Sequence, residues 1–265
     1  MKVSLIITTY NQPEVLQLVI RTVCEQTRLP DEIVIADDGS REETAEMIRS
    51  LRKLSPAPLL HVWQPDDGFR AARSRNNAIV ASLGDYLIFL DGDCFVNKHF
   101  VADHLSVASE KHFIVGTRVN IVPKRQQYIL ATGKTKISFF SWGTRKKFNA
   151  IRSPLLARFF RNKGGMASAN FSVWREDVYR INGFDETYTE HAGEDGDFAI
   201  RLNNTGVAMK RFAHLGMAYH FAHPHRPCPN WEERVKMQEE TSRNKVIRCE
   251  HGLDAPRDDC EIWKE

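Results

Sequence analysis

Apolar and polar residues along the first third of the chain alternate in a way that predicts strands and helices in turn. Four unbroken, β-branched-rich apolar runs are typical of strands buried on both faces of a sheet: 3–10, 32–38, 59–64 and 86–93. The segments between these runs carry apolar residues at helical spacing, and they lie at 13–27, 42–54 and 69–83. This alternation predicts an α/β fold with a mostly parallel sheet covered by helices on both faces.

Beyond about residue 112 the pattern is looser. We expect strands at 113–122 and 166–175, a short helix at 194–204, an extended segment at 209–223 and a terminal helix at 231–247. The chain contains no internal repeat and no low-complexity linker, so no domain boundary stands out.

Composition places the chain among soluble globular proteins. Of its 265 residues 42% are hydrophobic and 27% are charged, and no apolar run approaches the length of a membrane-spanning helix. The N-terminal run is too short for a signal peptide and lacks a cleavage site. The five cysteines form no CxxC pair, which argues against a disulfide framework and favours a reducing cytoplasm.

The net charge of +3 hides a strongly basic segment. Between residues 124 and 163 there are eleven Lys or Arg residues and no Asp or Glu, with aromatic residues interspersed. Such a segment is typical of a solvated loop that orders only with substrate, or of a surface that meets an anionic partner. No recognised nucleic-acid-binding motif accompanies it, so we expect no nucleic-acid partner.

Polar residues follow three of the predicted strands: Thr8 and Tyr10, Asp37 and Asp38, and Asp91 and Asp93. In a parallel sheet the carboxyl ends of the strands share one edge, where ligands bind. Two neighbouring carboxylates repel each other, so they must protonate, stay solvated or share a cation, and oxygen ligands suit Mg²⁺ or Mn²⁺. The alternatives are a turn with Gly92 at positive φ and solvated aspartates at 91 and 93, and helix capping at 37–40.

Further candidates lie on the predicted helices at 69–83 and 194–204 and in the segment 220–225. Glu194 and Asp195 begin a predicted helix, where a carboxylate is stabilised, although a helix-dipole role without chemistry is the alternative. The segment 220–225 supplies three candidate imidazole ligands, each of which has a purely structural alternative: His220, His223 and His225. Three arginines, one or more of which we expect to contact phosphate, lie on the helix at 69–83, where a solvated face is the alternative: Arg70, Arg73 and Arg75.

These motifs occur together, in order, in one known family. "SLIITTYNQPEVLQLVIRTVCEQT", "EIVIADDGS", "GFRAARSRNNAI", "YLIFLDGDC", "NFSVWREDVYRINGFDE" and "GEDGDFAIRL" resemble family-2 glycosyltransferases of the GT-A fold over about residues 1–225. The chain is similar to bacterial enzymes that build lipopolysaccharide or capsule. Its C-terminal half resembles galactosyltransferase and chondroitin-polymerase domains.

The resemblance implies a nucleotide-diphosphate sugar as donor, usually a UDP-sugar, with Mn²⁺ or Mg²⁺ as cofactor. The positions that match the family's uracil and ribose contacts are Thr8, Tyr10, Asp37 and Asp38. Asp91 and Asp93 match its DXD motif, with Asp93 as the direct metal ligand, and His220 matches a metal-binding histidine, with His223 as a close rival. Asp195 matches the catalytic base and Glu194 an acceptor contact, whereas "SRNNA" departs from the usual "ARNxG" at Ala78.

The resemblance therefore implies a metal-dependent, inverting glycosyltransferase that acts on a glycan or glycolipid acceptor in bacterial surface polysaccharide synthesis. It also divides the chain into a nucleotide-sugar half at 1–122, an acceptor and catalytic half at 123–225 and a helical tail at 226–265. We expect a cytoplasmic enzyme, with the basic segment 124–163 touching a phosphorylated glycolipid acceptor or the inner leaflet of the membrane.

Three other classes compete with this interpretation. A phosphohydrolase with a nucleophilic first Asp also places DxD after an apolar strand, but usually near the N-terminus. A non-catalytic nucleotide-sugar binding module has no need of Glu194 and Asp195. A dinucleotide dehydrogenase is disfavoured because no GxGxxG follows the first strand.

Overall fold

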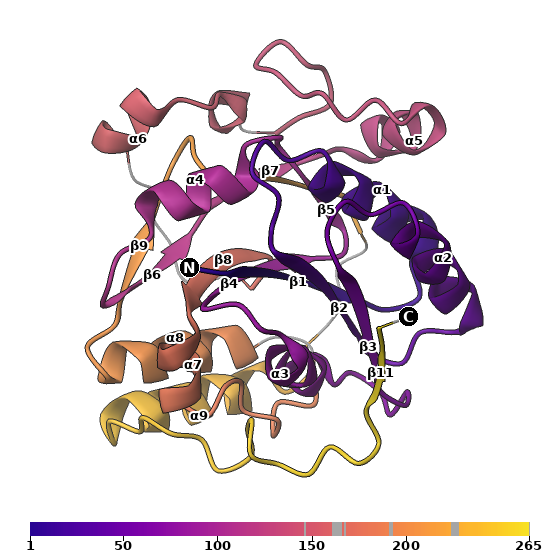
Figure 1. Ribbon diagram of the computed structural model, residues 1–265. Coiled ribbons are helices and arrows are strands. Elements are labelled where there is room, and N and C mark those ends of the chain that lie inside the picture. Colours follow the sequence, from indigo (N-terminus) through magenta and orange to yellow (C-terminus); the bar gives the residue numbers. More distant parts are fainter. Residues whose placement is uncertain (146, 161–165, 167, 191–192, 224–227, 265) are drawn as a thin grey trace.

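The computed structural model describes residues 1–145, 147–160, 166, 168–190, 193–223 and 228–264 (Figure 1). His225 lies outside these residues, as do small parts of the basic segment and of the predicted C-terminal tail.

Four parallel strands form the centre of an eight-stranded sheet, as the alternation of elements predicts. They are β1 (Val3–Thr9), β2 (Glu32–Asp37), β3 (Leu59–Trp63) and β4 (Tyr86–Asp91). The strand order is β11-β3-β2-β1-β4-β8-β6-β9, in which β1 pairs in parallel with both β2 and β4. Thr8 lies opposite Asp91 and Thr9 opposite Asp37. The polar ends of these strands therefore meet at one edge of the sheet.

Helices cover both faces of this sheet (Figure 1). α1 (Pro13–Cys24) and α2 (Glu42–Arg52) pack on the face to which Leu5 and Ile7 of β1 point. α3 (Ala71–Ala81) packs on the opposite face, where Ile6 lies in the second hydrophobic cluster. The buried runs of the sequence supply both clusters because successive residues of a strand face opposite sides.

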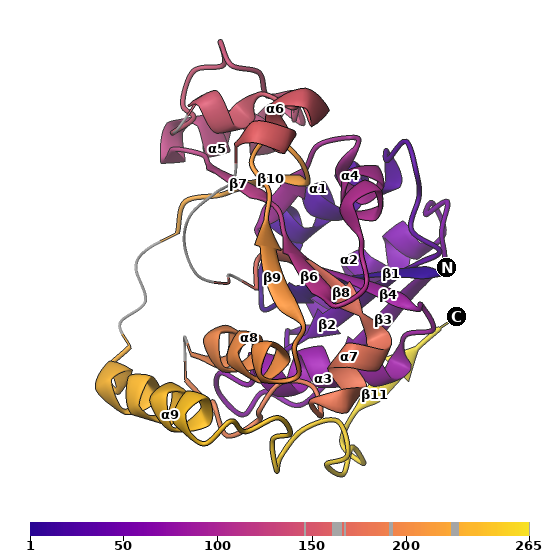
Figure 2. The same cartoon turned by 90° about the vertical axis from the view of Figure 1, so that its left-hand side faces the viewer.

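The second half of the chain extends the same sheet. β8 (Asn170–Trp174) pairs antiparallel with β4, β6 (His112–Val115) pairs antiparallel with β8, and β9 (Ala208–Arg211) completes that edge. α8 (Glu194–Asn204) packs beside α3 through Phe198 and Leu202, with α7 (Arg175–Arg180) and α9 (Trp231–Arg243) on the same side (Figures 1 and 2). The two predicted halves thus share one sheet, and the position of a boundary at 122 stays a prediction.

A second sheet of three strands stands beside the first. Its order is β5 (Cys94–Val96), β10 (Met217–His220) and β7 (Thr117–Asn120). The single strand predicted at 113–122 is therefore wrong, because the chain leaves the large sheet after β6 and enters the small one at Gly116. A side chain at Gly116 would lie 2.5 Å from the carbonyl oxygen of Gly216, so this crossing requires glycine. The extended segment at 209–223 likewise divides into β9 and β10.

Several elements were not predicted. They are β5, α4 (Phe100–Val107), α5 (Pro123–Thr132), the 3₁₀ helix Lys147–Ala150, α6 (Pro154–Phe159), α7 and β11 (Glu261–Trp263). β11 pairs antiparallel with β3 and covers that edge of the sheet. In the described part of the chain, every helix is too short or too polar to cross a membrane.

Candidate active site

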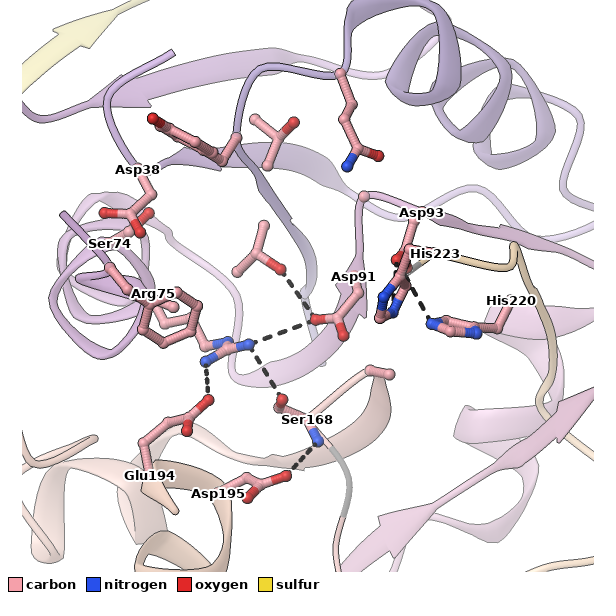
Figure 3. Close-up of a pocket in the computed structure, with 18 of the residues that line it drawn as sticks. Asp38, Ser74, Arg75, Asp91, Asp93, Ser168, Glu194, Asp195, His220 and His223 are labelled. Atoms are coloured by element: carbon pink, nitrogen blue, oxygen red, sulfur yellow. Dashed lines mark hydrogen bonds and ion pairs between the residues drawn. The ribbon is translucent and has the colours of Figure 1, made fainter. Parts of the chain in front are cut away.

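A pocket of about 620 Å³ opens at the edge where the parallel strands end (Figure 3). This volume is ordinary for a small-molecule site. Residues from β1, α3, the β4–β5 turn, β7, α8 and the end of β10 line it. They include ten of the positions that the sequence singled out: Thr8, Tyr10, Asp38, Arg75, Asp91, Asp93, Glu194, Asp195, His220 and His223. The predicted convergence of separate acidic loops is therefore present in the structure.

One end of the pocket is formed by β1 and the turn after β2. Asp38 accepts hydrogen bonds from Gln64 Nε2 at 2.7 Å and from the backbone N–H of Arg70 at 2.9 Å. Burial of Asp38 raises its pKa to about 6. The hydroxyl of Tyr10 donates to Asp66 at 2.9 Å, and the ring is half-exposed. An aromatic ring beside fixed carboxylates is suited to a base and a ribose.

Three residues predicted to contact the nucleotide do not line this pocket. Asp37 is buried behind Asp38, where it accepts from His61 Nε2 and from the backbone N–H of Ser40, both at 2.8 Å. Arg73 turns its guanidinium to Glu186 and Asp259, so its donors are used in holding the C-terminal segment. Arg70 pairs with Asp67 at 3.1 Å, and only its backbone N–H reaches Asp38.

The β4–β5 turn separates two aspartates with different surroundings. Asp91 accepts from Thr8 Oγ1 at 3.0 Å and lies 3.4 Å from Arg75 Nη2. Gly92 is not among the residues at positive φ, but a side chain there would lie 2.4 Å from the carbonyl oxygen of Thr8. Position 92 therefore requires glycine because two strand ends approach each other closely there. The alternative that the sequence left open, a turn with Gly92 at positive φ and solvated aspartates, is not what the structure shows.

Asp93 faces two histidines from the end of β10. Its Oδ2 lies 3.5 Å from Nε2 of His220 and 3.8 Å from Nε2 of His223 (Figure 3). Burial alone would raise the pKa of Asp93, but the hydrogen bond and charge of His220 hold that pKa below its usual value. Ligand atoms that share an ion at about 2.1 Å lie roughly 3 Å apart, so this donor set fits one divalent cation after a small contraction.

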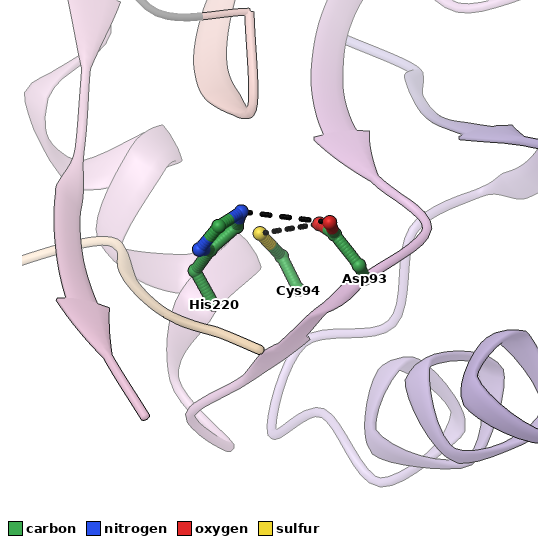
Figure 4. A group of neighbouring side chains, drawn as sticks. All are labelled: Asp93, Cys94 and His220. Carbon is green, nitrogen blue, oxygen red and sulfur yellow. Dashed lines mark hydrogen bonds and ion pairs between the residues drawn. The ribbon is translucent and has the colours of Figure 1, made fainter. Parts of the chain in front are cut away.

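Cys94 is the third member of the group around Asp93, and sequence reasoning missed it (Figure 4). Candidate ligand atoms of Asp93, Cys94 and His220 all lie within 4.8 Å of one another. Burial and the neighbouring aspartates raise the pKa of the Cys94 thiol well above its usual value, so the sulfur is protonated. The carboxylate of Asp93 and the imidazole of His220 are donors that suit a divalent cation such as Mn²⁺.

Arg75 connects the two sides of the pocket, although nothing in the sequence distinguishes it from Arg70 and Arg73. Its Nη1 donates to Glu194 at 3.0 Å, and its Nη2 donates to Ser168 Oγ at 3.1 Å and approaches Asp91. The guanidinium is buried and stacks near the ring of Phe184. Of the three arginines, only Arg75 lies on the face of α3 that is turned towards the pocket. The segment 69–83 is weakly amphipathic, so its sequence did not predict which face of the helix is turned inward.

α8 presents Glu194 and Asp195 at its first turn. Gly193 precedes them with φ of 109°, a backbone conformation that favours glycine. Asp195 accepts from the backbone N–H groups of Ser168 at 3.2 Å and Gly196 at 2.8 Å. Burial and the charge of Glu194 raise the pKa of Asp195 to about 6. A carboxylate with such a pKa is matched to general-base work near neutral pH.

Comparison with known proteins agrees with this architecture. Residues 4–180, more than half of the chain, match glycosyl transferase family 2, and residues 158–224 match the N-terminal domain of galactosyltransferase. The chain therefore belongs to glycosyl transferase family 2.

Curated relatives with related sequences are longer proteins. The chain is 26% identical over 240 residues to chondroitin synthase of Escherichia coli, an alignment that covers 82% of this chain and 34% of the relative. It is 27% identical to hyaluronan synthase of Pasteurella multocida, an alignment that covers 82% of this chain and 24% of the relative. It is 26% identical to validoxylamine A glucosyltransferase of Streptomyces hygroscopicus subsp. limoneus, where the alignment covers 78% of this chain and 49% of the relative. The chain thus spans between about a quarter and a half of these relatives.

Solved structures show the same fold. The mannosyltransferase PcManGT from Pyrobaculum calidifontis, in complex with GDP-Man and Mn²⁺, superposes with a TM-score of 0.60 at 18% identity, covering 93% of this chain and 64% of that one. GalNAc-T7 with UDP, GalNAc and Mn²⁺ superposes with a TM-score of 0.66 at 16% identity, covering 91% and 50%. The predicted α/β fold of the GT-A type is confirmed.

Proposed function

We propose that this protein is a metal-dependent, inverting glycosyltransferase that moves a sugar from a UDP-sugar to a hydroxyl group of a glycan or glycolipid acceptor. One observation carries the proposal. A single pocket holds Asp93 with its two histidines and, on a helix from the other half of the chain, Asp195. Relatives named as chondroitin and hyaluronan synthases, and neighbours solved with sugar nucleotides and Mn²⁺, support the same class.

The donor would occupy the pocket from Asp38 towards Asp93. Thr8, Tyr10 and Asp38 are the proposed nucleoside contacts, and Asp37 positions the turn from behind. Asp93 and His220, with His223 beside them, would hold Mn²⁺ or Mg²⁺. When bound, the cation neutralises the charge that builds on the departing diphosphate.

Asp195 is the proposed general base. A carboxylate oxygen of Asp195 takes the proton from the acceptor hydroxyl. At the same time the oxygen of that hydroxyl attacks the anomeric carbon and the nucleoside diphosphate departs. Glu194 would hold the acceptor, because its Oε2 is buried without a hydrogen-bond partner among the described residues. One base and one direct attack predict inversion at the anomeric carbon.

Arg75 would hold the donor side and the acceptor side of the pocket at fixed positions relative to each other. It pairs with Asp91 on the donor side and with Glu194 on the acceptor side. A buried cation between two carboxylates fixes their positions, since loss of either partner leaves an uncompensated charge.

We further propose a role in bacterial surface polysaccharide synthesis at the cytoplasmic face of the membrane. The support is the basic segment 124–163, in which Phe140 is 88% exposed and Phe159 is 75% exposed. Aromatic side chains together with cations and without acidic residues are typical of contact with an anionic lipid surface.

A donor screen tests the central proposal. Purified protein would be incubated with Mn²⁺ and a panel of UDP-sugars, with GDP-mannose as a comparison, and release of the nucleotide measured. We expect one UDP-sugar to give release that EDTA abolishes. Tight UDP binding without turnover in the presence of any glycan acceptor would instead indicate a binding module.

A further inference from the structure

Arg118 is a cation in the pocket for which the proposed reaction has no use. It lines the pocket from β7, and its side chain is exposed. Among the residues that the structure describes, it has no hydrogen-bond or ion-pair partner. The other pocket arginine, Arg75, is by contrast buried and engaged with Asp91 and Glu194.

The small sheet places Arg118 beyond the metal candidates. β10 separates β7 from β5, and Asp93 directly precedes β5. Neighbouring strands lie about 4.8 Å apart, so β7 is roughly 10 Å from β5. Arg118 pairs with Ala218, and Asn120 pairs with His220.

The register also fixes the direction of the side chain. Residues opposite one another, and residues two positions apart on one strand, point to the same face of a sheet. Arg118 therefore shares its face with Ala218 and His220. Asp38, at the proposed nucleoside end, lies on the other side of Asp93 from His220 (Figure 3).

A second arginine lies close to Arg118. Arg211 ends β9 opposite Val115, and the chain continues from Val115 through Gly116 into β7. Thr117 Oγ1 donates to the carbonyl of Phe212 at 3.0 Å, which ties the two segments together. Burial and the charge of Arg118 lower the pKa of Arg211. Two cations held near each other favour a bound anion.

We propose that Arg118, with Arg211 beside it, forms a subsite for an anionic group carried by the acceptor, either the carboxylate of a uronic acid or a phosphate. The inference rests on the proposed function, because it places the acceptor on the side of the pocket away from the nucleoside. A guanidinium presents paired N–H donors that match both carboxylate and phosphate.

The rest of the pocket is acidic, so the charge of Arg118 would offset the repulsion of an anionic acceptor. Five carboxylates line the pocket: Asp38, Asp91, Asp93, Glu194 and Asp195. An anionic acceptor that approaches Asp195 would be repelled by them unless a cation holds its charged group. We expect a charge-assisted contact of this kind to change acceptor affinity by about ten- to a hundredfold.

The test compares acceptor analogues that differ in one group. Binding of p-nitrophenyl β-glucuronide, β-glucoside and β-glucoside 6-phosphate, and of the corresponding galacto compounds, would be titrated into protein saturated with UDP and Mn²⁺. We expect at least one anionic compound to bind about tenfold or more tightly than its neutral counterpart. In Arg118→Gln this preference should disappear, and in Arg118→Glu it should reverse. Arg180→Gln, which removes an exposed cation outside the pocket, is the matched control.

Results that contradict the subsite can be told apart from a result that contradicts the proposed function. Equal affinity for anionic and neutral compounds in every pair would overturn the subsite. Weaker UDP–Mn²⁺ binding in Arg118→Gln, with the anion preference intact, would overturn it by assigning Arg118 to the donor diphosphate. Failure of the wild-type protein to bind UDP at all would instead refute the proposed function, and it is seen before any acceptor is added.

Discussion

Asp91 and Asp93 are two residues apart, yet their side chains have different partners. Asp91 faces Thr8 and Arg75, whereas Asp93 faces His220 and His223. The sequence predicted both as metal ligands, and the geometry favours Asp93 as the ligand that shares a cation with imidazoles. Strand register cannot be read from a DGD triplet, so the sequence could not separate these two roles.

Asp93→Ala is expected to weaken Mn²⁺-dependent UDP binding by about tenfold or more, because it removes the carboxylate at the centre of the group. Calorimetric titration of UDP with and without Mn²⁺ measures the effect. His220→Ala should weaken binding more than His223→Ala, since His220 is nearer to Asp93 and less exposed. UDP affinity that is indifferent to EDTA in the wild-type protein would remove the metal assignment.

Asp195→Asn should leave UDP binding intact and lower the rate of transfer by about 10²- to 10⁴-fold, the usual contribution of a positioned general base. The amide keeps the size of the side chain but cannot take a proton. Asp258→Asn, at an exposed position outside the pocket, is the matched control. Normal turnover in Asp195→Asn would exclude this residue as the base.

The pH dependence of transfer should follow the ionisation of Asp195. Because its pKa is raised to about 6, the carboxylate form that accepts a proton is lost as the pH falls below this value. The rate at saturating donor and acceptor is expected to fall about tenfold per pH unit below 6 and to level off above 7. A rate that rises towards acidic pH would contradict this role.

The helices and strands whose apolar residues recur at a regular spacing were predicted from the sequence. Those that depend on contacts with distant parts of the chain were not. The four strands of the parallel sheet and the three helices between them follow from apolar runs and helical spacing. α4, α5 and α6 are short, and α5 and α6 lie in a basic segment with few buried residues. β11 depends on pairing with β3, from which it is separated by most of the chain. A local pattern holds no information on such a partner.

The membrane prediction rests on the basic segment 124–163, which contains α6 and most of α5. Phe140 follows α5 in the chain and Phe159 is the last residue of α6, and both side chains are exposed. α5 and α6 lie together at one end of the molecule (Figure 2). Wild-type protein is expected to co-sediment with liposomes that contain anionic lipid at low salt, and Phe140→Ser with Phe159→Ser should reduce the bound fraction several-fold. Leu83→Ser, which replaces an exposed apolar residue elsewhere, is the control. Absence of wild-type binding at low salt would reject the proposed contact.

At the scale of the whole molecule, the C-terminal segment returns to the sheet beside β3, near the proposed nucleoside end of the pocket. Trp263 of β11 packs against His61, with ring centroids 4.7 Å apart, and His61 bonds to Asp37. Arg257 bonds to Asn77 and Glu186, so the segment also crosses α3. The family motifs end before this region, and the sequence therefore predicted no role for it.

Trp263→Ala should lower the melting temperature, because it removes aromatic contacts with His61 and Trp63. A loss of about 1–3 kcal/mol corresponds to a decrease of roughly 3–10 °C for a domain of this size. Thermal unfolding measures the shift, and Lys264→Ala, at an exposed neighbour, should leave the melting temperature unchanged. An unchanged value for Trp263→Ala would mean that β11 adds little to the fold.

The ion pair between Arg75 and Glu194 joins positions that are 119 residues apart. A hybrid enzyme could be built by exchanging the first half of this chain for that of another glycosyltransferase. Here such an exchange would separate two buried, oppositely charged groups, and a neutral residue at either place would leave its former partner uncompensated. Successful chimaeras of this chain will therefore have to carry both positions together, whatever sugar they are built to transfer.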